Sequence, residues 1–541
     1  MADQETTRLC VWITKCHFGD IVANVVQALS SHGRLMFREL VLFTKLKPRA
    51  IRAALLVLTQ HGLLWHSVSG EEEMYELNID GCLIRLRFGK FLVITGQLFG
   101  DEGVSIVQAI LDNGRMRYLD LLTALPLIDR ASCQKITRKL IQGRFIQSTS
   151  EYFNKSHVDR VAEMEQVLIA GDTATKNSAL ASAKRLAEKK LGAEQLVREK
   201  EEEIQSMALK SLETSKSSKG KEKAKTIDDT IWFCVNYAKF NILIRNGMIE
   251  AAVRARFNES AAAVMKAILS GTEGSQSSLA ELRSEAIGSH SILEELQEED
   301  DLLVGLARKS SKGSSNATSL REYLAFLSAA DSASPKGKSN AFLSTSSASG
   351  SGSGKVQVEF YAIYRQMKLA VLDGYVRERW DIWALRIVRI LLSMGKMEEK
   401  QLSKVAMIAP NDVRPLISVL SSASIINLHE VPKGKDFMPR RTFYFWDVDL
   451  KKVNAVMLST LTKTMANILE RKAAESERNP MLRTLLETRE RTDVAEDETL
   501  LSAGDKKLLE RWEEKMMKLA ALEARVEEAI FILRDLPLED W

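Results

Sequence analysis

Apolar residues recur three and four positions apart along most of this chain and seldom alternate with polar ones, which predicts a mainly helical protein with short strands. Three segments repeat one pattern of apolar helix, glycine and two further helices. They are residues 20–66, 103–149 and 384–430, referred to as copies one, two and four. Such spacing in segments so far apart indicates a repeated module rather than chance.

Each copy shows five landmarks in a fixed order. A glycine ends the first helix, a basic and a large apolar residue follow, and a leucine, an aliphatic and a small residue come seven, twenty-two and twenty-nine positions after the glycine. These landmarks are Gly33, Arg34-Leu35, Leu40, Leu55 and Gly62 in copy one; Gly114, Arg115-Met116, Leu121, Ile136 and Gly143 in copy two; and Gly395, Lys396-Met397, Leu402, Ile417 and Ser424 in copy four.

The spacing has a simple physical interpretation. A glycine can adopt a left-handed conformation and stop the first helix. A second helix and a turn follow, the turn carrying Pro48 in copy one and Pro126 in copy two. The third helix has apolar residues on one face, and LLWHSVS and MYELN after it in copy one are typical of a β-hairpin. A helix-turn-helix followed by such a hairpin is a winged helix.

A looser copy three is expected from about residue 227. The segment IDDTIWFCVNYAKFNILIRNG predicts a helix ending at Gly247, and SAAAVMKAILSG (260–271) predicts the third helix. Arg254 stands where the leucine is expected, so this copy departs from the pattern. Its hairpin is expected to be interrupted and to resume at 356–368.

Polar, low-complexity segments separate some of these units. Residues 209–225 are rich in Ser and Lys, and residues 331–355 are rich in Ser and Gly, so neither buries enough apolar surface to offset the entropy of ordering. The polar run 308–319 is similar, and LREYLAFLSAA (320–330) predicts a short apolar helix between flexible arms.

The C-terminal section shows a different pattern. Met457, Leu461 and Ile468 share one helical stripe, and heptad spacing continues over residues 505–534, where Glu523 interrupts the seam. The apolar positions of this second stretch are Leu509, Trp512, Met516, Leu519, Val526, Ile530 and Leu533. Polar residues between the two stretches favour an antiparallel helical hairpin, although two amphipathic helices packed on the body explain the pattern equally well.

The predicted fold class is therefore mainly α, built of α+β modules: four tandem winged-helix domains with small β-hairpin wings and a C-terminal antiparallel helical coiled coil. The expected domains are winged helix one (1–95), winged helix two with a trailing helix (96–208), a flexible linker (209–226), winged helix three with a disordered insertion at about 308–355 (227–380), winged helix four (381–450) and the coiled-coil hairpin (451–541).

Composition narrows the function classes. The 541 residues include 76 Lys and Arg against 72 Asp and Glu, so a histone-like basic mass is excluded while local basic surfaces are not. The five cysteines are scattered, which favours a reducing compartment over a disulfide framework. The N-terminus lacks the features of a signal peptide, and no apolar run is long enough to predict a membrane span.

No pattern predicts catalysis. The run GSGSGK (350–355) lacks the first glycine and the final Ser or Thr of a phosphate-binding loop, so a linker is the better interpretation. Cys10, Cys16 and His17 have no second ligand pair at zinc spacing. We therefore expect no enzyme activity, no cofactor, no metal and no small-molecule ligand.

Basic residues around the third helices are candidates for DNA phosphate contact. They are Lys45, Lys47, Arg49 and Arg52 in copy one, and Arg130, Lys135, Arg138 and Lys139 in copy two. An ordinary solvated helix face explains them about as well, and base-specific readout is not expected. The third helix of copy four has only Arg414 and an internal proline, which favours protein docking. Its wing carries the possible contacts Lys433, Lys435, Arg440 and Arg441.

Several strings carry a resemblance to a known family: GRLMFRELVLFTKLKPRAIRAALLVLTQHGLLWH, EYFNKSHVDR, ALRIVRILLSMGKMEEKQLSKVAMIAPNDVRPLISVL and RRTFYFWDVD. Over nearly its whole length the chain resembles subunit three of eukaryotic DNA-directed RNA polymerase III, a family related to the large subunit of general transcription factor IIE. The resemblance implies four tandem extended winged helices with a C-terminal coiled coil.

The same resemblance implies a non-catalytic nuclear subunit for transcription of small RNA genes such as those of tRNA and 5S rRNA. Such a subunit would sit on the clamp of the largest polymerase subunit, form a trimer with two small subunits, and assist promoter-directed initiation and DNA opening. Non-specific DNA contact is expected, and membrane association is not. The alternatives are a free winged-helix regulator that homodimerises through its C-terminal helices, and an enzyme whose site the sequence does not reveal.

Overall fold

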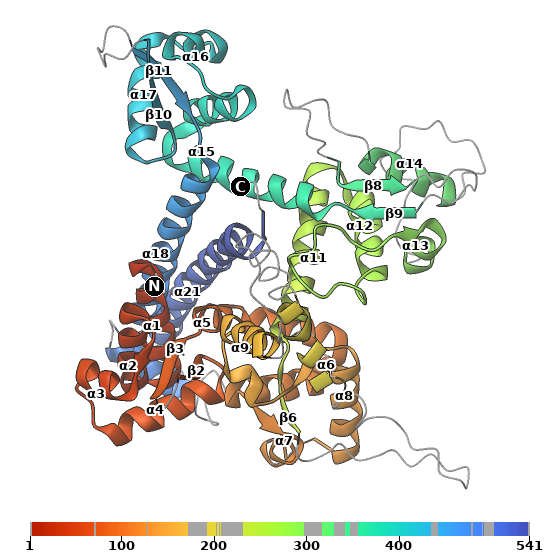
Figure 1. The fold of residues 1–541 in the computed structure, drawn as a ribbon, viewed down its shortest axis with the longest axis vertical. Helices are drawn as coiled ribbons and strands as arrows, with labels where there is room; N and C mark the ends of the chain where they lie inside the picture. The colour runs from red at the N-terminus through yellow and green to blue at the C-terminus, as the bar shows by residue number, and fades with distance from the viewer. Residues whose placement is uncertain are drawn as a thin grey trace. The chain divides into compact units, whose positions relative to one another are not determined.

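The computed structural model describes residues 3–69, 72–126, 128–170, 192–197, 199–201, 203–204, 206, 231–296, 316–328, 341–346, 355–433, 442–477, 480–489, 491 and 502–538. The chain folds as two compact units, Met1–Phe240 and Asn241–Trp541. Helices dominate both, and each winged helix adds a sheet of two or three short strands (Figure 1). This architecture confirms the predicted fold class.

Copy one is a complete winged helix. A leading helix, α1 (Gln4–Phe18), precedes the three helices α2 (Asp20–His32), α3 (Phe37–Thr44) and α4 (Pro48–Gln60). The strands are β1 (Leu35–Met36), β2 (Leu64–Ser69) and β3 (Glu72–Leu77), and β3 lies between the other two. Leu35 therefore pairs with Tyr75, so the strand after the first helix closes on the last strand of the wing.

Copy two has the same topology, but its wing is completed far along the chain. After α5 (Ile79–Ile84) and the 3-10 turn η1 (Arg85–Arg87), its elements are α6 (Phe88–Asn113), β4 (Met116–Arg117), α7 (Tyr118–Ala124), α8 (Arg130–Gln142), β5 (Ile146–Thr149) and β6 (Trp232–Val235). Strand β6 pairs with both β4 and β5. The 3-10 turn η2 (Glu151–Asn154) and α9 (His157–Ala170) lie between β5 and β6 in sequence.

Two predictions about this region are wrong. Residues 227–247 were predicted to form one helix opening copy three, yet Trp232–Val235 is a strand of copy two, and α11 (Tyr237–Arg256) runs through Gly247. A short apolar run does not by itself distinguish a strand from a helix. The long insertion before β6 is tolerated because the entropic cost of closing a loop grows slowly with loop length.

Copy two also contains one additional residue between its second and third helices. Helix α8 starts sixteen positions after Gly114, whereas α4 starts fifteen positions after Gly33. The predicted landmarks Ile136 and Gly143 are therefore shifted by one: Thr137 is the buried residue, and Arg144 has the left-handed φ of 61°. Copies one and four have that conformation at the predicted positions, Gly62 and Ser424.

Copy three is a winged helix whose parts were assigned incorrectly from sequence. Its sheet has the order β7-β9-β8, the order of the other three-stranded sheets, which makes α12 the first helix rather than the predicted third. The elements are α12 (Glu259–Gly271), β7 (Ile287–Gly288), α13 (Ser289–Glu295), α14 (Asn316–Ser328), β8 (Leu343–Ser346) and β9 (Lys355–Val358). Helix α14, expected only as an isolated helix, takes the third position.

The predicted disordered insertion at about 308–355 is therefore wrong for two of its segments. Residues 316–328 are helical, and residues 343–346 pair with β9. Leu320 and Leu343 are 0% and 1% exposed, because the few apolar side chains of this Ser-rich region fill the core of copy three. A segment of polar composition can therefore form a strand when the elements packed against it supply the rest of the core.

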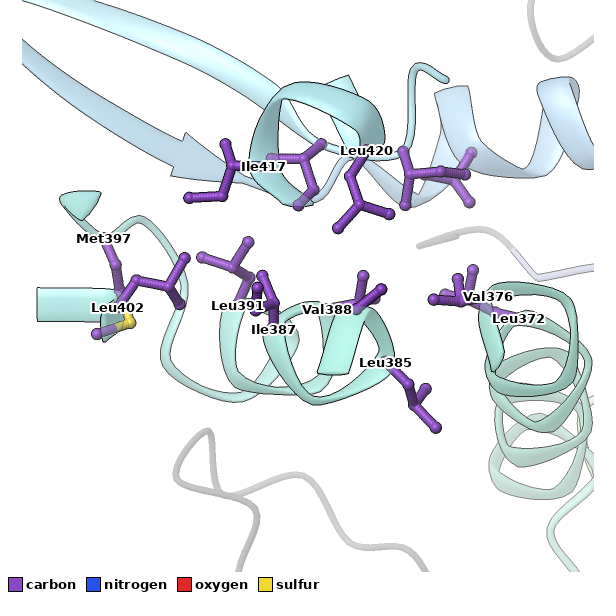
Figure 2. Close-up of a cluster of buried hydrophobic side chains, with 14 of the residues drawn as sticks. Leu372, Val376, Leu385, Ile387, Val388, Leu391, Met397, Leu402, Ile417 and Leu420 are labelled. Carbon is purple, nitrogen blue, oxygen red and sulfur yellow. The ribbon is translucent and has the colours of Figure 1, made fainter. Parts of the chain in front are cut away.

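Copy four begins within a long bent helix, α15 (Phe360–Met394). It continues through α16 (Glu399–Ala406), α17 (Pro410–Ser422), β10 (Asn427–Pro432) and β11 (Thr442–Asp447). A single bridge between Met397 and Trp446 stands in place of the first strand. Side chains of α15, α16 and α17 converge on one apolar core, including Ile387, Val388, Leu402, Ile417 and Leu420 (Figure 2).

The C-terminal helices form an intramolecular antiparallel hairpin. Helices α18 (Leu450–Glu477) and α21 (Ala503–Ile530) lie side by side, and α19 (Pro480–Arg489) contacts both (Figure 1). Lys472 of α18 bonds Glu523 of α21 at 2.6 Å, so the charge that interrupts the predicted seam is paired. The π-helical segment Phe531–Asp535 ends the hairpin, and its Leu533 is buried in the core of copy four with Val453 of α18.

A left-handed residue starts the first helix in copies one, two and four. It stands fourteen positions before the terminal glycine each time: Gly19 (φ 85°), Gly100 (φ 74°) and Asp381 (φ 78°). The last two produce the bends within α6 and α15. With ψ near 180°, this conformation is one that only glycine adopts without strain. Asp381 compensates in part, because its carboxylate accepts a hydrogen bond from the Ile382 amide at 2.7 Å.

The strain at Asp381 can be measured by comparing two substitutions. Asp381→Gly and Asp381→Ala both remove the carboxylate cap, but only Gly relieves the backbone strain of about 1–3 kcal/mol. We expect hydrogen exchange of the amides of residues 382–394 to report the Gly variant as more stable by about 1 kcal/mol. At exposed Gln401 inside α16 the order should reverse, since Gly is worse than Ala in a helix interior by about 1 kcal/mol.

A partly buried cluster of His61, Arg85 and Phe18 joins the end of α4 to α1 and η1. The Arg85 guanidinium lies 4.6 Å from the centre of the Phe18 ring and 3.3 Å from Nδ1 of His61. Burial, followed by the charge of Arg85, lowers the pKa of His61 from 6.5 to about 4. The folded chain therefore keeps this imidazole neutral at pH values where the unfolded chain protonates it.

Copy one should consequently lose stability as the pH falls from about 7 towards 4. Over that interval the unfolded state binds a proton that folded His61 does not, so unfolding becomes more favourable. Because His61 is partly exposed, we expect no more than about 1 kcal/mol at pH 5. Hydrogen exchange of α4 amides at pH 7 and pH 5 measures this, and His61→Gln should remove most of the difference.

Candidate nucleic-acid interface

The basic end of copy one, defined as Lys45, Lys47, Arg49 and Arg52, surrounds the N-terminus of α4. Lys45 terminates α3 in a left-handed conformation (φ 54°), and Lys47 is the N-cap of α4. Pro48 occupies the first helical position, where its missing N–H removes no helical hydrogen bond. All four basic side chains are exposed. The turn between the two helices therefore gathers charges that are consecutive or nearly so in sequence.

The packing of α4 determines where these side chains point. Ile51, Leu55 and Leu58 are buried against the core, so Arg49 and Arg52 lie on the opposite, solvent-facing side. The guanidinium of Arg52 is held 5.2 Å from the centre of the Phe37 ring. Among the described residues, Lys45, Lys47 and Arg49 form no ion pair.

This arrangement suits an anion. The first turn of α4 contains no acidic residue, and the N–H groups at a helix N-terminus attract negative charge. Phosphate contacts of this kind position a protein on a duplex without reading its sequence. Leu56, which is 72% exposed, lies further along the same face, so the surface is basic at one end and apolar at the other.

The corresponding surface of copy two is less uniform. Arg130 begins α8, and Lys135 and Lys139 are exposed one and two turns further along. Arg138 is only half-buried rather than exposed and has interactions within the fold. The four predicted residues therefore lie on one helix, but only three of them are exposed, and Arg138 is not.

The third helix of copy four has few basic side chains free for phosphate, as its sequence predicts. Arg414 of α17 bonds Glu399 of α16 at 2.6 Å, and Asp412 lies in the first turn of the helix. On the wing, the ammonium group of Lys433 lies 4.5 Å from the centre of the Phe443 ring. The other predicted wing contacts, Lys435, Arg440 and Arg441, lie outside the described residues, as does nearly all of the GSGSGK run.

The basic residue that follows the first-helix glycine has a structural role in copies one and two. Arg34 bonds Glu76 of β3 at 2.8 Å and Asp159 of α9 at 2.9 Å. Arg115 donates to Asn154 at 2.5 Å. These charges hold α9 and η2 against the winged helices and are therefore not available to phosphate. Spacing alone did not distinguish them from the exposed cations nearby.

Other candidate chemistry does not assemble into a site. Cys10 is buried and Cys16 is exposed, so the two side chains are in different environments. Within the described residues no three His, Cys, Asp or Glu side chains are grouped to hold a metal, and no helix there is long and apolar enough to span a bilayer.

Sequence reasoning missed one surface, on the outer side of α15 in copy four. Ile382 and Trp383 are 54% and 47% exposed there. The signal was present in the repeat: the equivalent positions are Asp20 and Ile21 in copy one and Asp101 and Glu102 in copy two. Three of these four equivalent side chains in copies one and two are carboxylates. The fold therefore does not require large apolar residues at these two positions.

Three family models match the chain. Residues 8–67 match the helix-turn-helix domain of RNA polymerase III subunit RPC82, residues 135–377 match RNA polymerase III subunit RPC82, and residues 372–448 match the C-terminal winged-helix domain of POLR3C. The first covers copy one and the last covers copy four. The second begins within α8 of copy two and includes all of copy three.

Curated relatives extend this similarity to nearly the whole chain. The chain is 26% identical to the DNA-directed RNA polymerase III subunit RPC3 of Danio rerio, with 98% of each chain covered. It is 25% identical to the subunit of that name from Mus musculus and 24% identical to that from Homo sapiens, again with 98% of each chain covered.

The basic end of copy one predicts a salt-dependent contribution to DNA binding. Replacing Lys45, Lys47, Arg49 and Arg52 together by Ala should weaken binding of duplex DNA and reduce the slope of log affinity against log salt by about 0.9 for each phosphate that the variant no longer neutralises. Fluorescence anisotropy over a salt series measures that slope. Arg414→Ala is the matched control, because its charge is already paired with Glu399, and it should leave the slope unchanged. An unaltered slope in the fourfold variant would contradict phosphate contact.

Proposed function

Because the chain belongs to the RPC3 family of RNA polymerase III subunits, we propose that it docks on the clamp of the polymerase within a three-subunit subcomplex. In this proposal two small subunits complete the trimer, and the trimer assists promoter-directed initiation and DNA opening at small RNA genes. The chain itself is a non-catalytic subunit and has other polymerase subunits as its partners. A polymerase of this class implies a nuclear location.

One observation supports DNA contact in particular. The third helices of copies one and two present cations to solvent, around the N-terminus of α4 and along α8, whereas the same helix of copy four has its single arginine neutralised by Glu399. Three copies of one fold therefore carry different surfaces. We assign duplex DNA, without sequence preference, to the basic surfaces of copies one and two, and protein partners to copy four.

The build of the chain also fits a docking subunit. Winged helices with fully packed cores offer rigid surfaces, and copy four is joined to the C-terminal hairpin through a shared core that includes Met457 and Leu533. Rigid surfaces bind partners without an additional entropic cost of ordering. A partner seated on either element would then be held in a defined position relative to the other.

The alternative function, a free regulator that homodimerises through its C-terminal helices, is less well supported. Such a dimer needs an unpaired apolar seam, but Leu509 and Ile530 of α21 are buried within the chain, and α21 already packs on α18. In the part of the hairpin that the structure describes, Lys472 pairs with Glu523 and Lys515 with Glu475 between α18 and α21, and Arg489 of α19 pairs with Glu513 of α21.

The proposed role in opening DNA is tested by comparing two templates. We expect polymerase assembled with the fourfold variant Lys45→Ala, Lys47→Ala, Arg49→Ala and Arg52→Ala to lose promoter-directed initiation on closed duplex several-fold. On a template with a pre-melted start site the loss should be smaller, since opening is no longer required. Single-round transcription on both templates measures this difference.

Assembly is tested in the same preparations. A tagged chain should co-purify with two small subunits and the polymerase, and the fourfold variant should retain them. The variant Arg283→Ala serves as the control with both templates, because its charge is already paired with Glu359 and it lies outside the surfaces assigned to DNA or protein. Purification of the chain as an isolated homodimer, with no polymerase subunit bound, would contradict the proposed function and support the regulator.

A further inference from the structure

Copy four carries a surface groove on the outer face of α15. It has a volume of about 670 Å³ and is lined by residues of α15 and α16, among them the buried Leu385, the partly buried Ile390 and the exposed Trp383 and Val405. In Figure 2 Leu385 points to the side of α15 opposite Ile417 and Leu420, away from the centre of the core. The groove is thus mainly apolar and open to solvent, with Arg386, Arg389 and Ser393 as its polar lining residues.

The bend at Asp381 explains how the groove forms. Helix α15 restarts after this residue, and its inner face, which includes Ile387 and Val388, fills the core of copy four. The opposite face then carries Ile382, Trp383, Arg386, Arg389 and Ile390 at helical spacing. The scaffold requires only the inner face to be apolar.

The repeat supplies an internal comparison for the outer face. In copy one the equivalent residues are Asp20, Ile21, Asn24, Gln27 and Ala28, and in copy two they are Asp101, Glu102, Ser105, Gln108 and Ala109. At the position of Val405, copy one has Phe43, whose ring stacks on His32 with 4.1 Å between ring centres. Apart from Ile21, these positions thus hold small or polar side chains or a stacked ring in copies one and two, whereas in copy four they line a groove.

Charge indicates which partner fits. Arg386 is exposed and its guanidinium lies 5.9 Å from the centre of the Trp383 ring, while Arg389 is oriented by a 2.6 Å bond to Asp373. Since Asp373 already pairs with Arg389, the remaining charges between Asp381 and Met407 are four basic residues, Arg386, Lys396, Lys400 and Lys404, against three acidic ones, Asp381, Glu398 and Glu399. Glu399 is already paired with Arg414. Tryptophan and arginine are also the residue types that contribute most to binding energy at interfaces.

We propose that this groove binds an acidic amphipathic helix of a partner polypeptide. Apolar side chains at i, i+3, i+4 and i+7 of that helix would enter the groove beside Trp383 and Ile390, and flanking carboxylates would meet Arg386 and the lysines of α16. Net positive charge around the groove disfavours a basic segment by like-charge repulsion. This inference rests on the proposed function in one respect: each treats the chain as a docking subunit.

A peptide titration of the full chain tests the chemistry of the partner. The probe is a fluorescein-labelled helical peptide with Leu at i, i+3, i+4 and i+7 and Glu at the flanking positions, and a second peptide has Lys in place of Glu. The acidic peptide should bind and the basic one should not. The variant Ile382→Asp, Trp383→Glu, Arg386→Ser should weaken binding by more than about tenfold. Its three new residues are those of copy two at the same positions, so the scaffold accommodates them.

Two further variants make the titration specific. Arg386→Glu should bind the basic peptide better than the acidic one, a reversal that a purely apolar groove would not produce. Val419→Asp, which alters an exposed apolar side chain on α17 of the same copy, should leave binding unchanged. Equal binding of both peptides, or equal binding by the triple variant, would overturn the proposal. So would displacement of the peptide by a single-stranded oligonucleotide.

Photo-crosslinking in the assembled polymerase identifies the natural occupant. A benzophenone amino acid at Ile390 should crosslink to a segment rich in Asp and Glu with apolar residues three and four apart, while one at the equivalent Ala109 should not. Crosslinks to a second copy of this chain, to a basic segment, to nucleic acid or to nothing would each reject the acidic helix. The amount of polymerase that co-purifies with the chain in these preparations tests the proposed function separately. The proposed function and the acidic-helix proposal can therefore fail independently.

Discussion

The architecture depends on antiparallel pairing between the chain just after a first helix and the last strand of the wing. Leu35 pairs with Tyr75, Met116 with Phe233, Ile287 with Val356, and Met397 with Trp446 in the four copies. Each pairing closes a small sheet over three helices and so completes the core. Because the paired residues are brought together in space, the chain between wing strands can be short, as in copy one, or long, as in copy two.

Comparing the repeated copies distinguishes residues that the fold requires from residues that differ between surfaces. The inner face of the first helix is apolar in copies one, two and four, whereas the outer face carries Asp101 and Glu102 in one copy and Ile382 and Trp383 in another. Arg34 and Arg115, although part of the repeated pattern, are bound to side chains of their own unit. Lys47 and Arg49 are not, so their charges remain available to solvent or to phosphate. A subunit without catalytic chemistry can in this way differ from copy to copy only in what its surfaces bind.

The cores and ion pairs also determine which parts act together. In the second unit, Val453, Met457 and Leu533 complete the core of copy four, so the base of the C-terminal hairpin and this winged helix share buried surface. A force applied to the hairpin by a bound partner would therefore reach α15 and α16 through packed side chains.

Sequence by itself determined the winged-helix repeat of copies one, two and four and the candidate basic residues, because helix stops, turns and amphipathic faces are encoded by residues close together in the chain. Leu40, Leu402 and the glycines of copies one and four occupy their predicted places for that reason. Only the tertiary structure decided that Trp232–Val235 belongs to copy two, that α14 is the third helix of copy three, and that Ile382 and Trp383 border a groove. Strand pairing and groove shape depend on residues far apart in sequence, and short apolar runs carry no record of their partners.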